Sequence, residues 1–414
     1  MLLKKLLAVC IVTMAISDSS FAQISFHDFY KYEIENVFGK PPAVSPALVS
    51  VANIEQLYGA VNNPANAGMV VSMAAGIYML SANEPGGAAR PNGGRIDLLT
   101  NMSLIGVVNN RSAVVIDAIN LPMSSYQPGD VPNTGAIRMG RGTNVVEWLT
   151  IRNAVNGLAG IETDINSGAT AFIRIAHVIS TGHQRGIDVR NFGSAMAGRS
   201  IVAEIVDNDL YDNIIGMGQG VRFLNSDLSH GATITATMSV NRSHNNLWGV
   251  IVSNNSVNLA TNSVTSYSDR FYENGLGAQI GGGLSTGAAA IITNGNVSNF
   301  TAIGTSFDNN NGFNNFDLGG LLVLGGANLS MPNRTSDNTV NVILQMCRFG
   351  NNQDLDIAVF GARSDPESIG TPGTNNAVNL YMRGTTPKFR VETFVDSVPQ
   401  FSGSMNIVNL TGFR

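Results

Sequence analysis

Short segments in which apolar and polar residues alternate recur along the chain, separated by turns rich in Asn, Asp and Gly. Each copy has an apolar pair, a polar turn, and then Gly followed by alternating apolar residues, as in 179–189 and 208–223. Glycines that begin such segments, at 160, 186, 220, 249, 277 and 320, lie 26, 34, 29, 28 and 43 residues apart. Alternation with period two predicts strands, and its repetition predicts a solenoid of β coils.

The first coil of a solenoid exposes sheet edges and apolar core, so the sequence should provide a cap there. Segment 53–61 fits this role, because Asn53 is a suitable N-cap and Ile54, Leu57, Tyr58 and Val61 fall at helical spacing. The next segment, 70–80, has the pattern of a strand, a tight turn and a second strand. We therefore expect a capping helix followed by the first coil.

The turn Ala75-Gly76-Ile77-Tyr78 and the following coil over 104–117 resemble the opening coils of pectate-lyase-like proteins. That resemblance covers roughly residues 50 to 385. It implies an all-β protein, a right-handed parallel β-helix solenoid of the pectin lyase fold with an N-terminal capping helix. The resemblance concerns the fold and does not select one enzyme family.

The two ends of the chain differ from the repeat. Residues 1–22 carry Lys4 and Lys5, an apolar stretch and small residues before Gln23, which predicts a cleaved signal peptide and a secreted protein at the cell surface, outside the cell or in the periplasm. Residues 23–50 form an N-terminal segment with a Pro-containing linker, 51–385 the β-helix, and 386–414 a C-terminal tail or cap. Removal of the signal leaves Cys347 as the one cysteine, which we expect to be a buried apolar residue.

The composition argues against nucleic acid and membrane as partners. Only 13% of the 414 residues are charged and the net charge is -5, so the chain lacks the basic surface that binds nucleic acid. No apolar run within the mature chain approaches the roughly 18 residues that span a bilayer, so we expect no membrane insertion. We expect a monomer.

The alternation also predicts which strand residues face outward. If the apolar residues 137, 161, 187, 221, 250, 278 and 321 point inward, their successors form an outward column: Arg138, Glu162, Asp188, Arg222, Ile251, Gln279 and Leu322. A second column two residues on contains Asp164, Arg190, Leu224 and Ser253. Adjacent coils stack about 4.8 Å apart, so neighbours in a column touch. The early coils therefore present a patch of ionisable side chains.

This patch supplies the candidate site. Two neighbouring carboxylates can bind Ca²⁺ or divide the acid and nucleophile roles on a sugar, and arginines can hold uronate carboxylates. The candidate catalytic residues are Asp188, Arg222, Glu162 and His183, and the candidate ligand-binding residues are Arg138, Asp164, Arg185 and Arg190. Glu162 and Asp188 are the metal ligands if Ca²⁺ binds, and His183 is expected to act as an acid or base at the rim.

Family motifs narrow the chemistry. Polygalacturonase-like hydrolases use an Asp-Asp pair and Gly-His-Gly, whereas this sequence has no Asp-Asp and carries Gly182-His183-Gln184. A lysine base of the chondroitinase-lyase type is absent from the coils. A pectate-lyase-like site remains, with Arg222 or Arg190 beside Asp188 and Glu162.

Two functions stay open on the sequence alone. In the first, the protein interacts with a polysaccharide or cell-surface glycan along the charged face, as a lyase or glycoside hydrolase if it is an enzyme. In the second, it is a non-catalytic surface, adhesion or structural protein, and the charged face is a solvated ladder of salt bridges worth about 0–1 kcal/mol per pair.

Overall fold

The computed structural model describes residues 47–122, 135–154, 159–163, 170–215, 218–226, 228–255, 257–285, 293–311, 318–328, 335–353, 355–361, 363–364, 375–385, 393–394 and 407–411. All of them belong to one unit that begins at Ala47. The predicted signal peptide, the linker up to residue 46 and Asp164 lie outside the described residues. None of the described helices is both long enough and apolar enough to span a bilayer.

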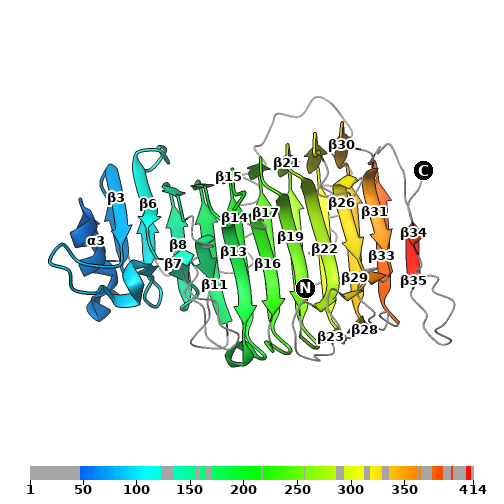
Figure 1. Ribbon diagram of the computed structural model, residues 1–414, viewed down its shortest axis with the longest axis horizontal. Helices are drawn as coiled ribbons and strands as arrows, with labels where there is room; N and C mark the ends of the chain where they lie inside the picture. The colour runs from blue at the N-terminus through cyan, green and yellow to red at the C-terminus, as the bar shows by residue number, and fades with distance from the viewer. Residues whose placement is uncertain are drawn as a thin grey trace, which may run out of the picture. The chain divides into compact units, whose positions relative to one another are not determined.

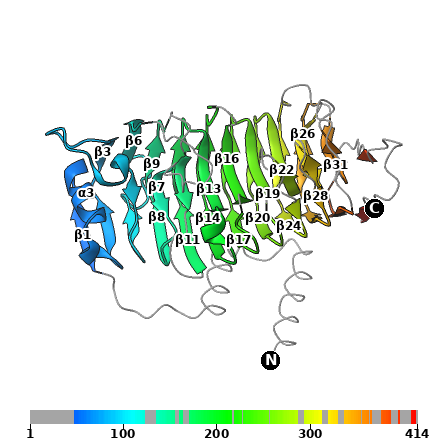
Figure 2. The same ribbon diagram turned by 60° about the horizontal axis from the view of Figure 1, so that its bottom comes forward.

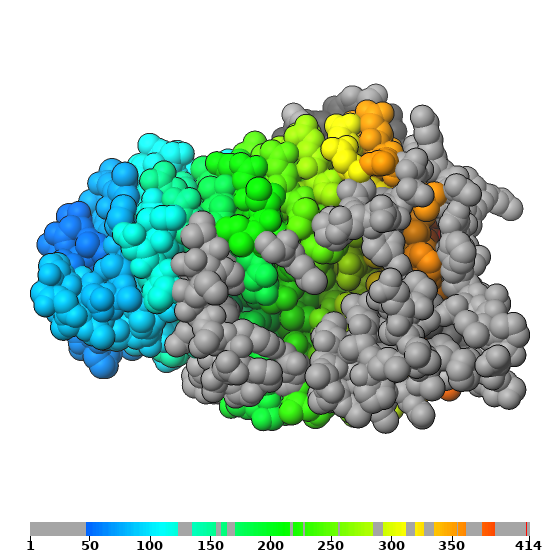
Figure 3. Space-filling view, in the orientation of Figure 1, coloured from blue at the N-terminus to red at the C-terminus, as the bar shows by residue number. Residues whose placement is uncertain are grey.

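Three parallel sheets make up this unit, and nearly every coil gives one strand to each (Figures 1 and 2). Strand follows strand in coil order within each sheet, which defines a parallel β-helix, and parallel crossovers of this kind are right-handed. In the space-filling view the described coils contact one another in sequence order (Figure 3). The predicted right-handed parallel β-helix is confirmed.

The element bounds are as follows. Sheet A contains β1 (Leu48–Val51), β2 (Val70–Met73), β5 (Ser103–Ile105), β8 (Thr143–Glu147), β11 (Thr170–Ala176), β14 (Ser200–Val206), β17 (Thr233–Ser239), β20 (Thr261–Tyr267), β24 (Val297–Ile303), β29 (Thr339–Gln345), β33 (Ala377–Arg383) and β35 (Ile407–Thr411). Sheet B contains β3 (Gly76–Ser81), β6 (Val114–Asn120), β9 (Thr150–Arg152), β12 (Ile179–Thr181), β15 (Asp209–Tyr211), β18 (Arg242–His244), β21 (Arg270–Tyr272), β25 (Ser306–Asp308) and β30 (Arg348–Gly350).

The third sheet, here called sheet C, holds the strands that follow the repeat glycines. It contains β4 (Ile96–Asp97), β7 (Gly135–Met139), β10 (Ala159–Thr163), β13 (Arg185–Phe192), β16 (Gln219–Ser226), β19 (Trp248–Asn255), β22 (Leu276–Ser285), β26 (Leu318–Leu324), β31 (Leu355–Phe360) and β34 (Thr393–Phe394), with β27 (Ala327–Asn328) and β32 (Arg363–Ser364) beside them. Strands β23 (Thr293–Asn294) and β28 (Thr335–Ser336) form a small separate sheet, and the 3-10 helices are η1 (Pro64–Asn66), η2 (Pro91–Gly94) and η3 (Ser194–Met196).

The capping helix is α3 (Ile54–Val61), as predicted. The Asn53 side chain accepts a hydrogen bond from the backbone N–H of Gln56, and Leu57, Tyr58 and Val61 are buried against the first coil. Such an N-cap contributes about 1 kcal/mol to the stability of a helix. At the other end, β34 and β35 lie within the predicted C-terminal segment and extend sheets C and A.

The core is formed by the inward residues of all three sheets. Phe271, Phe307 and Phe349 stack from coil to coil with ring centroids 5.4 and 4.8 Å apart. Each buried apolar side chain of this size contributes roughly 1.5–3 kcal/mol relative to an exposed one. Cys347 is buried among them, which confirms the prediction, and burial raises the pKa of its thiol to about 11.

Asparagines form a ladder inside the turn between sheets B and C. The backbone N–H of Asn213, Asn246, Asn274 and Asn310 each donates to the side-chain oxygen of the ladder residue in the next coil, at 3.0 to 3.1 Å, ending at Asn352. An Asn side chain accepts and donates at once, so one residue type can satisfy buried backbone groups coil after coil. Hydrogen-bonded stacking accounts for the abundance of Asn in the turns.

The repeat glycines have a steric cause. A Cβ placed on Gly249 would lie 2.4 Å from the carbonyl oxygen of Gly277, and one placed on Gly277 would lie 2.7 Å from that of Gly320. These distances are shorter than van der Waals contact, so the second residue of β13, β16, β19 and β22 is in each case the one without a side chain.

Candidate functional site

Sheet C brings the predicted outward column together. Its register pairs Arg138 with Glu162, Glu162 with Asp188, and Asp188 with Arg222. Asp97 precedes Arg138 in the same column, which the sequence analysis did not anticipate. In later coils the column continues through Ile251, Gln279 and Leu322, and the second column pairs Arg190 with Leu224. The predicted register is confirmed for every described member.

Arginines engage both central carboxylates. Arg222 binds Asp188 in bidentate fashion, with Nε to Oδ1 at 2.8 Å and Nη2 to Oδ2 at 2.6 Å. Arg190 donates to Glu162 through Nη2 and through Nε, the latter at 3.1 Å, and its Nε also lies 3.8 Å from Asp188 Oδ2. The fork of Arg222 meets both oxygens of Asp188, and both arginines make charge-assisted hydrogen bonds, which are the stronger type.

Burial separates the two kinds of charge. The side chains of Glu162 and Asp188 are 0% exposed, whereas Arg222 and Arg185 keep 13% and 16% of their side-chain surface in contact with solvent. This face is a ladder of ion pairs, as the alternative predicted, but its central acids are buried and not solvated. Of these four side chains, only the two arginines contact solvent.

The charges also set the ionisation of Asp188. Burial alone would raise its pKa, but the charges of Arg222, Arg185 and Arg190 outweigh this effect and lower the pKa to about 2. Asp188 is thus ionised at neutral pH. Glycoside hydrolysis needs one carboxylic acid that remains protonated, and Asp188 does not supply it.

Arg185 has no close carboxylate partner among the described residues of this face. It begins β13, its Nε is buried without a hydrogen bond, and the carboxylate it approaches, Asp188, is 3.8 Å away. Burial and the neighbouring charges of Arg222 and Arg190 lower the pKa of Arg185 to about 9, a shift that only Asp188 and Glu162 oppose. Burial also lowers the pKa of Arg95 on the same face.

On the described part of this face the cations outnumber the acids. The arginines are Arg95, Arg138, Arg141, Arg185, Arg190 and Arg222, and the acids are Asp97, Glu162 and Asp188. We call this set the arginine site. Among the described residues this set carries an excess of positive charge, which favours an anion nearby.

Calcium does not fit the same residues. Ca²⁺ takes six to eight oxygen ligands, but the oxygens of Glu162 and Asp188 already accept hydrogen bonds from Arg190 and Arg222. Among the described residues no three His, Cys, Asp or Glu side chains gather into a metal-binding group. The arrangement is suited to an anion rather than to a cation.

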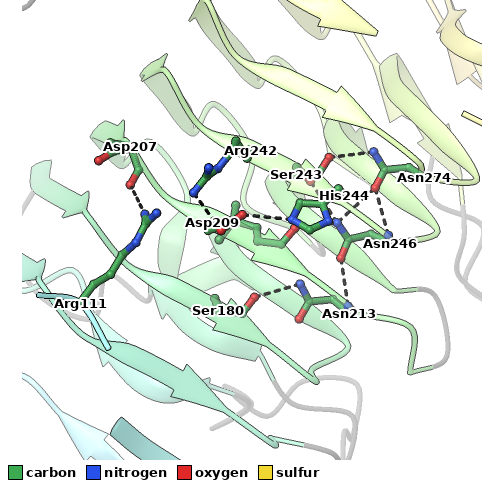
Figure 4. Close-up of polar contacts among 11 residues, drawn as sticks. Arg111, Ser180, Asp207, Asp209, Asn213, Arg242, Ser243, His244, Asn246 and Asn274 are labelled. Atoms are coloured by element: carbon green, nitrogen blue, oxygen red, sulfur yellow. Dashed lines mark hydrogen bonds and ion pairs between the residues drawn. The ribbon is translucent and has the colours of Figure 1, made fainter. Parts of the chain in front are cut away.

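His183 lies inside the coil and not at the rim, which corrects the sequence-based expectation. Its ring is 0% exposed; Nδ1 accepts from the backbone N–H of Ala154 at 3.0 Å and Nε2 lies 3.2 Å from the carbonyl oxygen of Ile151. The backbone N–H of His183 donates to the side-chain oxygen of Asn213, and the ladder continues from Asn213 through Asn246 and Asn274 (Figure 4). Burial lowers the pKa of His183 to about 4, so the ring is neutral and serves as the first rung of the ladder.

Sheet B carries a second polar cluster that the sequence analysis missed (Figure 4). Asp209 accepts from Arg242 Nη2 at 3.0 Å and lies 3.1 Å from His244 Nε2, and the His244 ring stacks between Tyr211 and Tyr272 at 5.2 and 4.7 Å. Burial opposes ionisation of Asp209, but the hydrogen bond from His244 and the charge of Arg242 lower its pKa. The sequence did contain a signal for this cluster: Tyr211, His244 and Tyr272 each lie two residues before a ladder asparagine.

This second cluster is poorly placed for proton transfer. One nitrogen of His244 faces Asp209, and the other, Nδ1, is buried and makes no hydrogen bond. A general base must present a nitrogen within reach of the substrate, and neither nitrogen does so here. The cluster therefore stabilises the stacked rings of sheet B.

No family model matches the chain, and no curated protein matches it. Solved structures do. The A-module of mannuronan C-5 epimerase AlgE6 from Azotobacter vinelandii aligns at 13% identity over 90% of this chain and 98% of that one, with a TM-score of 0.42. Pectate lyase Pel9A aligns at 12% identity over 87% and 83%, with a TM-score of 0.34, and PfbA, a surface adhesin of Streptococcus pneumoniae, at 9% over 87% and 85%, with a TM-score of 0.37.

This chain has the right-handed parallel β-helix fold. Its own three sheets establish that architecture, and the comparisons add no assignment of activity or substrate to it. The function has to be argued from the arginine site.

Proposed function

We propose that the protein is a secreted β-helix that binds an acidic polysaccharide across the arginine site of sheet C. The observation that carries this proposal is the difference in burial: the side chains of Glu162 and Asp188 are 0% exposed, while those of Arg185 and Arg222 keep 16% and 13% of their surface in contact with solvent. A polymer with a carboxylate on each sugar would meet cations first. The buried acids would hold those cations in place.

Arg185 is the residue we expect to contact the ligand. Arg190 and Arg222 are committed to Glu162 and Asp188, whereas the Arg185 guanidinium has its nearest recorded carboxylate at 3.8 Å. A ligand carboxylate would give it the close partner that the described residues do not. A hydrogen bond to a charged group contributes about 1.5–3 kcal/mol, equivalent to roughly ten- to hundred-fold in Kd.

Titration calorimetry on the full chain tests the proposal. Polygalacturonate and alginate should bind, and a neutral β-glucan should not; the affinity should fall as salt is added, because the contacts are charged. Arg185→Ala should weaken uronate binding by the ten- to hundred-fold given above. Arg242→Ala is the matched control, since Arg242 also pairs with one aspartate but lies on sheet B. Equal loss in both variants, or equal binding of the neutral glucan, would refute the assignment.

If the bound polymer is cleaved by elimination, the carbon next to the uronate carboxylate loses its proton to a base, the bond to the leaving glycosidic oxygen breaks and a carbon–carbon double bond forms. The rate of that reaction is followed by the ultraviolet absorbance of the unsaturated product. Chelating agents should not change that rate. Binding without any product identifies the protein as a non-catalytic surface or adhesion protein.

A further inference from the structure

The middle of sheet A differs from the other two faces because it carries no charge. Strands β17, β20, β24 and β29 each turn four side chains outward, and all are partly or fully exposed. We call this set the sheet A array: Thr233, Thr235, Thr237, Ser239, Thr261, Ser263, Thr265, Tyr267, Val297, Asn299, Thr301, Ile303, Thr339, Asn341, Ile343 and Gln345. Hydroxyl side chains are the commonest among them. The nearest charged outward residues are Glu204 on β14 and Arg383 on β33.

The array is regular in two dimensions. All seven residues of each strand pair with the corresponding residues of the next, without a register shift, from β14 through β33. Coils therefore repeat about every 4.8 Å and outward positions along a strand about every 6.7 Å. Figure 2 shows β14, β17, β20 and β24 following one another. Both repeats are similar to the repeats of oxygen atoms on a prism face of ice.

The side chains of the array are also held still. Threonine is stiff about its first side-chain torsion, so the hydroxyl and methyl groups keep one arrangement from coil to coil. In the column beside them, Asn379 donates to Asn341 at 2.8 Å, Asn341 to Asn299 at 2.8 Å, and Asn299 to Ser263 at 2.9 Å.

In one column of the array the hydroxyl groups are free to bind solvent. Thr237, Thr265 and Thr301 occupy successive coils in direct register. Within the described structure their hydroxyls have no hydrogen-bond partner in the protein. Three aligned hydroxyl groups at a fixed spacing can hold a row of water molecules with the same spacing.

The chemistry of the array argues against other occupants. A polyanion would find no cation on it, in contrast to the arginine site. A second protein copy would need the apolar and aromatic centre typical of stable interfaces, and the centre of the array is hydroxyl and amide. A flat glycan surface is usually met by aromatic faces, and Tyr267 is the one aromatic ring in the array.

We propose that the sheet A array is an ice-binding surface. It takes ordered water as its ligand, through the aligned hydroxyl and methyl groups of Thr237, Thr265 and Thr301, which repeat from coil to coil. This inference is independent of glycan binding by sheet C.

Ice-affinity partitioning of the purified full chain tests it, with inhibition of ice recrystallisation as a second readout. The wild-type protein should be incorporated into slowly grown ice. Thr265→Tyr and Thr301→Tyr, which place a ring in the middle of the array, should each lose that incorporation. Thr181→Tyr is the control, since Thr181 faces outward on sheet B.

Thermal melting of each variant checks that it folds, and the use of two positions covers a failure of either one. Exclusion of the wild-type protein from ice, as for serum albumin, would overturn the proposal. So would incorporation of both array variants at the wild-type level. Binding of the wild type to an insoluble neutral glucan, lost in Thr265→Tyr, would assign the array to a sugar instead and would also overturn it.

Discussion

Asp269 occupies a position where a buried amide would fit better, and replacing it by Asn should stabilise the protein in a pH-dependent way. A second ladder runs through Asn208 and Asn241 and ends at Asp269, whose Oδ1 accepts from the backbone N–H of Asn241 at 2.7 Å and from its side-chain amide at 2.9 Å. Oδ2 accepts from the hydroxyl of Ser266 at 2.6 Å. The carboxyl group is fully buried, and neither of its oxygens is recorded in contact with a cationic side chain.

Burial raises the pKa of Asp269 from 3.8 to about 7, against the lowering effect of its hydrogen bonds. Between these two pH values the folded protein holds a proton that the unfolded chain has released, so stability falls as the pH rises from about 4 to 7 and then stays level. A difference of about three pKa units corresponds to about 4 kcal/mol. Asp269→Asn removes this loss, because an amide does not ionise.

The amide can keep the hydrogen bonds. Its oxygen replaces Oδ1, and its NH₂ group can donate to the Ser266 hydroxyl, which lies 2.9 Å from the Thr305 hydroxyl and can donate there in turn. Urea unfolding at pH 4 and pH 8, followed by tryptophan fluorescence, gives the measurement. Wild type and variant should be about equal at pH 4, and the variant should be more stable by up to about 4 kcal/mol at pH 8. A difference that does not change with pH, or a variant less stable at pH 8, would refute the reasoning.

Two further predictions concern the turns. Gly249→Ala should lower the free energy of unfolding by about 1–3 kcal/mol in urea denaturation, because the new Cβ would lie 2.4 Å from a backbone carbonyl oxygen. The control is Gly59→Ala on the exposed face of α3, where a Cβ meets nothing within 4 Å, and it should be neutral or stabilising. Equal losses of stability in the two variants would contradict the steric argument. His183→Asn should keep the wild-type stability at pH 8 and any activity on uronates, since all the remaining positions of that ladder are Asn. His183→Ala should lower the free energy of unfolding by about 1–3 kcal/mol, because it leaves buried groups unpaired. Loss of activity in a stable His183→Asn variant would restore His183 as a catalytic candidate.

Register could be predicted from the sequence because two independent constraints fix it. Period-two alternation allows a strand to be placed in two ways, with either set of side chains inward. The repeat glycine removes that ambiguity, because it must lie where the carbonyl oxygen of the next coil approaches, as at Gly249. Once each strand is anchored at its glycine, the pairing of Glu162 with Asp188 and of Asp188 with Arg222 follows.

Burial could not be predicted in the same way. Alternation reports which side of the strand Glu162 occupies, and not how much of that side is in contact with solvent. The position of His183 was missed for a related reason: its ladder partners are Asn, and a histidine imitates an Asn only when both ring nitrogens meet backbone groups at the right places, as they do at Ala154 and Ile151.

Stacking in direct register also explains why the arginine site takes the form it does. Glu162 and Asp188 are neighbours in one column at the spacing of adjacent strands, where two carboxylates repel each other strongly in a buried setting. Direct stacking holds the two acids next to each other, so each is paired with an arginine. Arg190 from the second column pairs with Glu162, and Arg222 from the next coil pairs with Asp188. Arg185 then remains beside two other cations with its nearest recorded carboxylate at 3.8 Å, and a carboxylate from a bound polymer is the group that would complete the compensation.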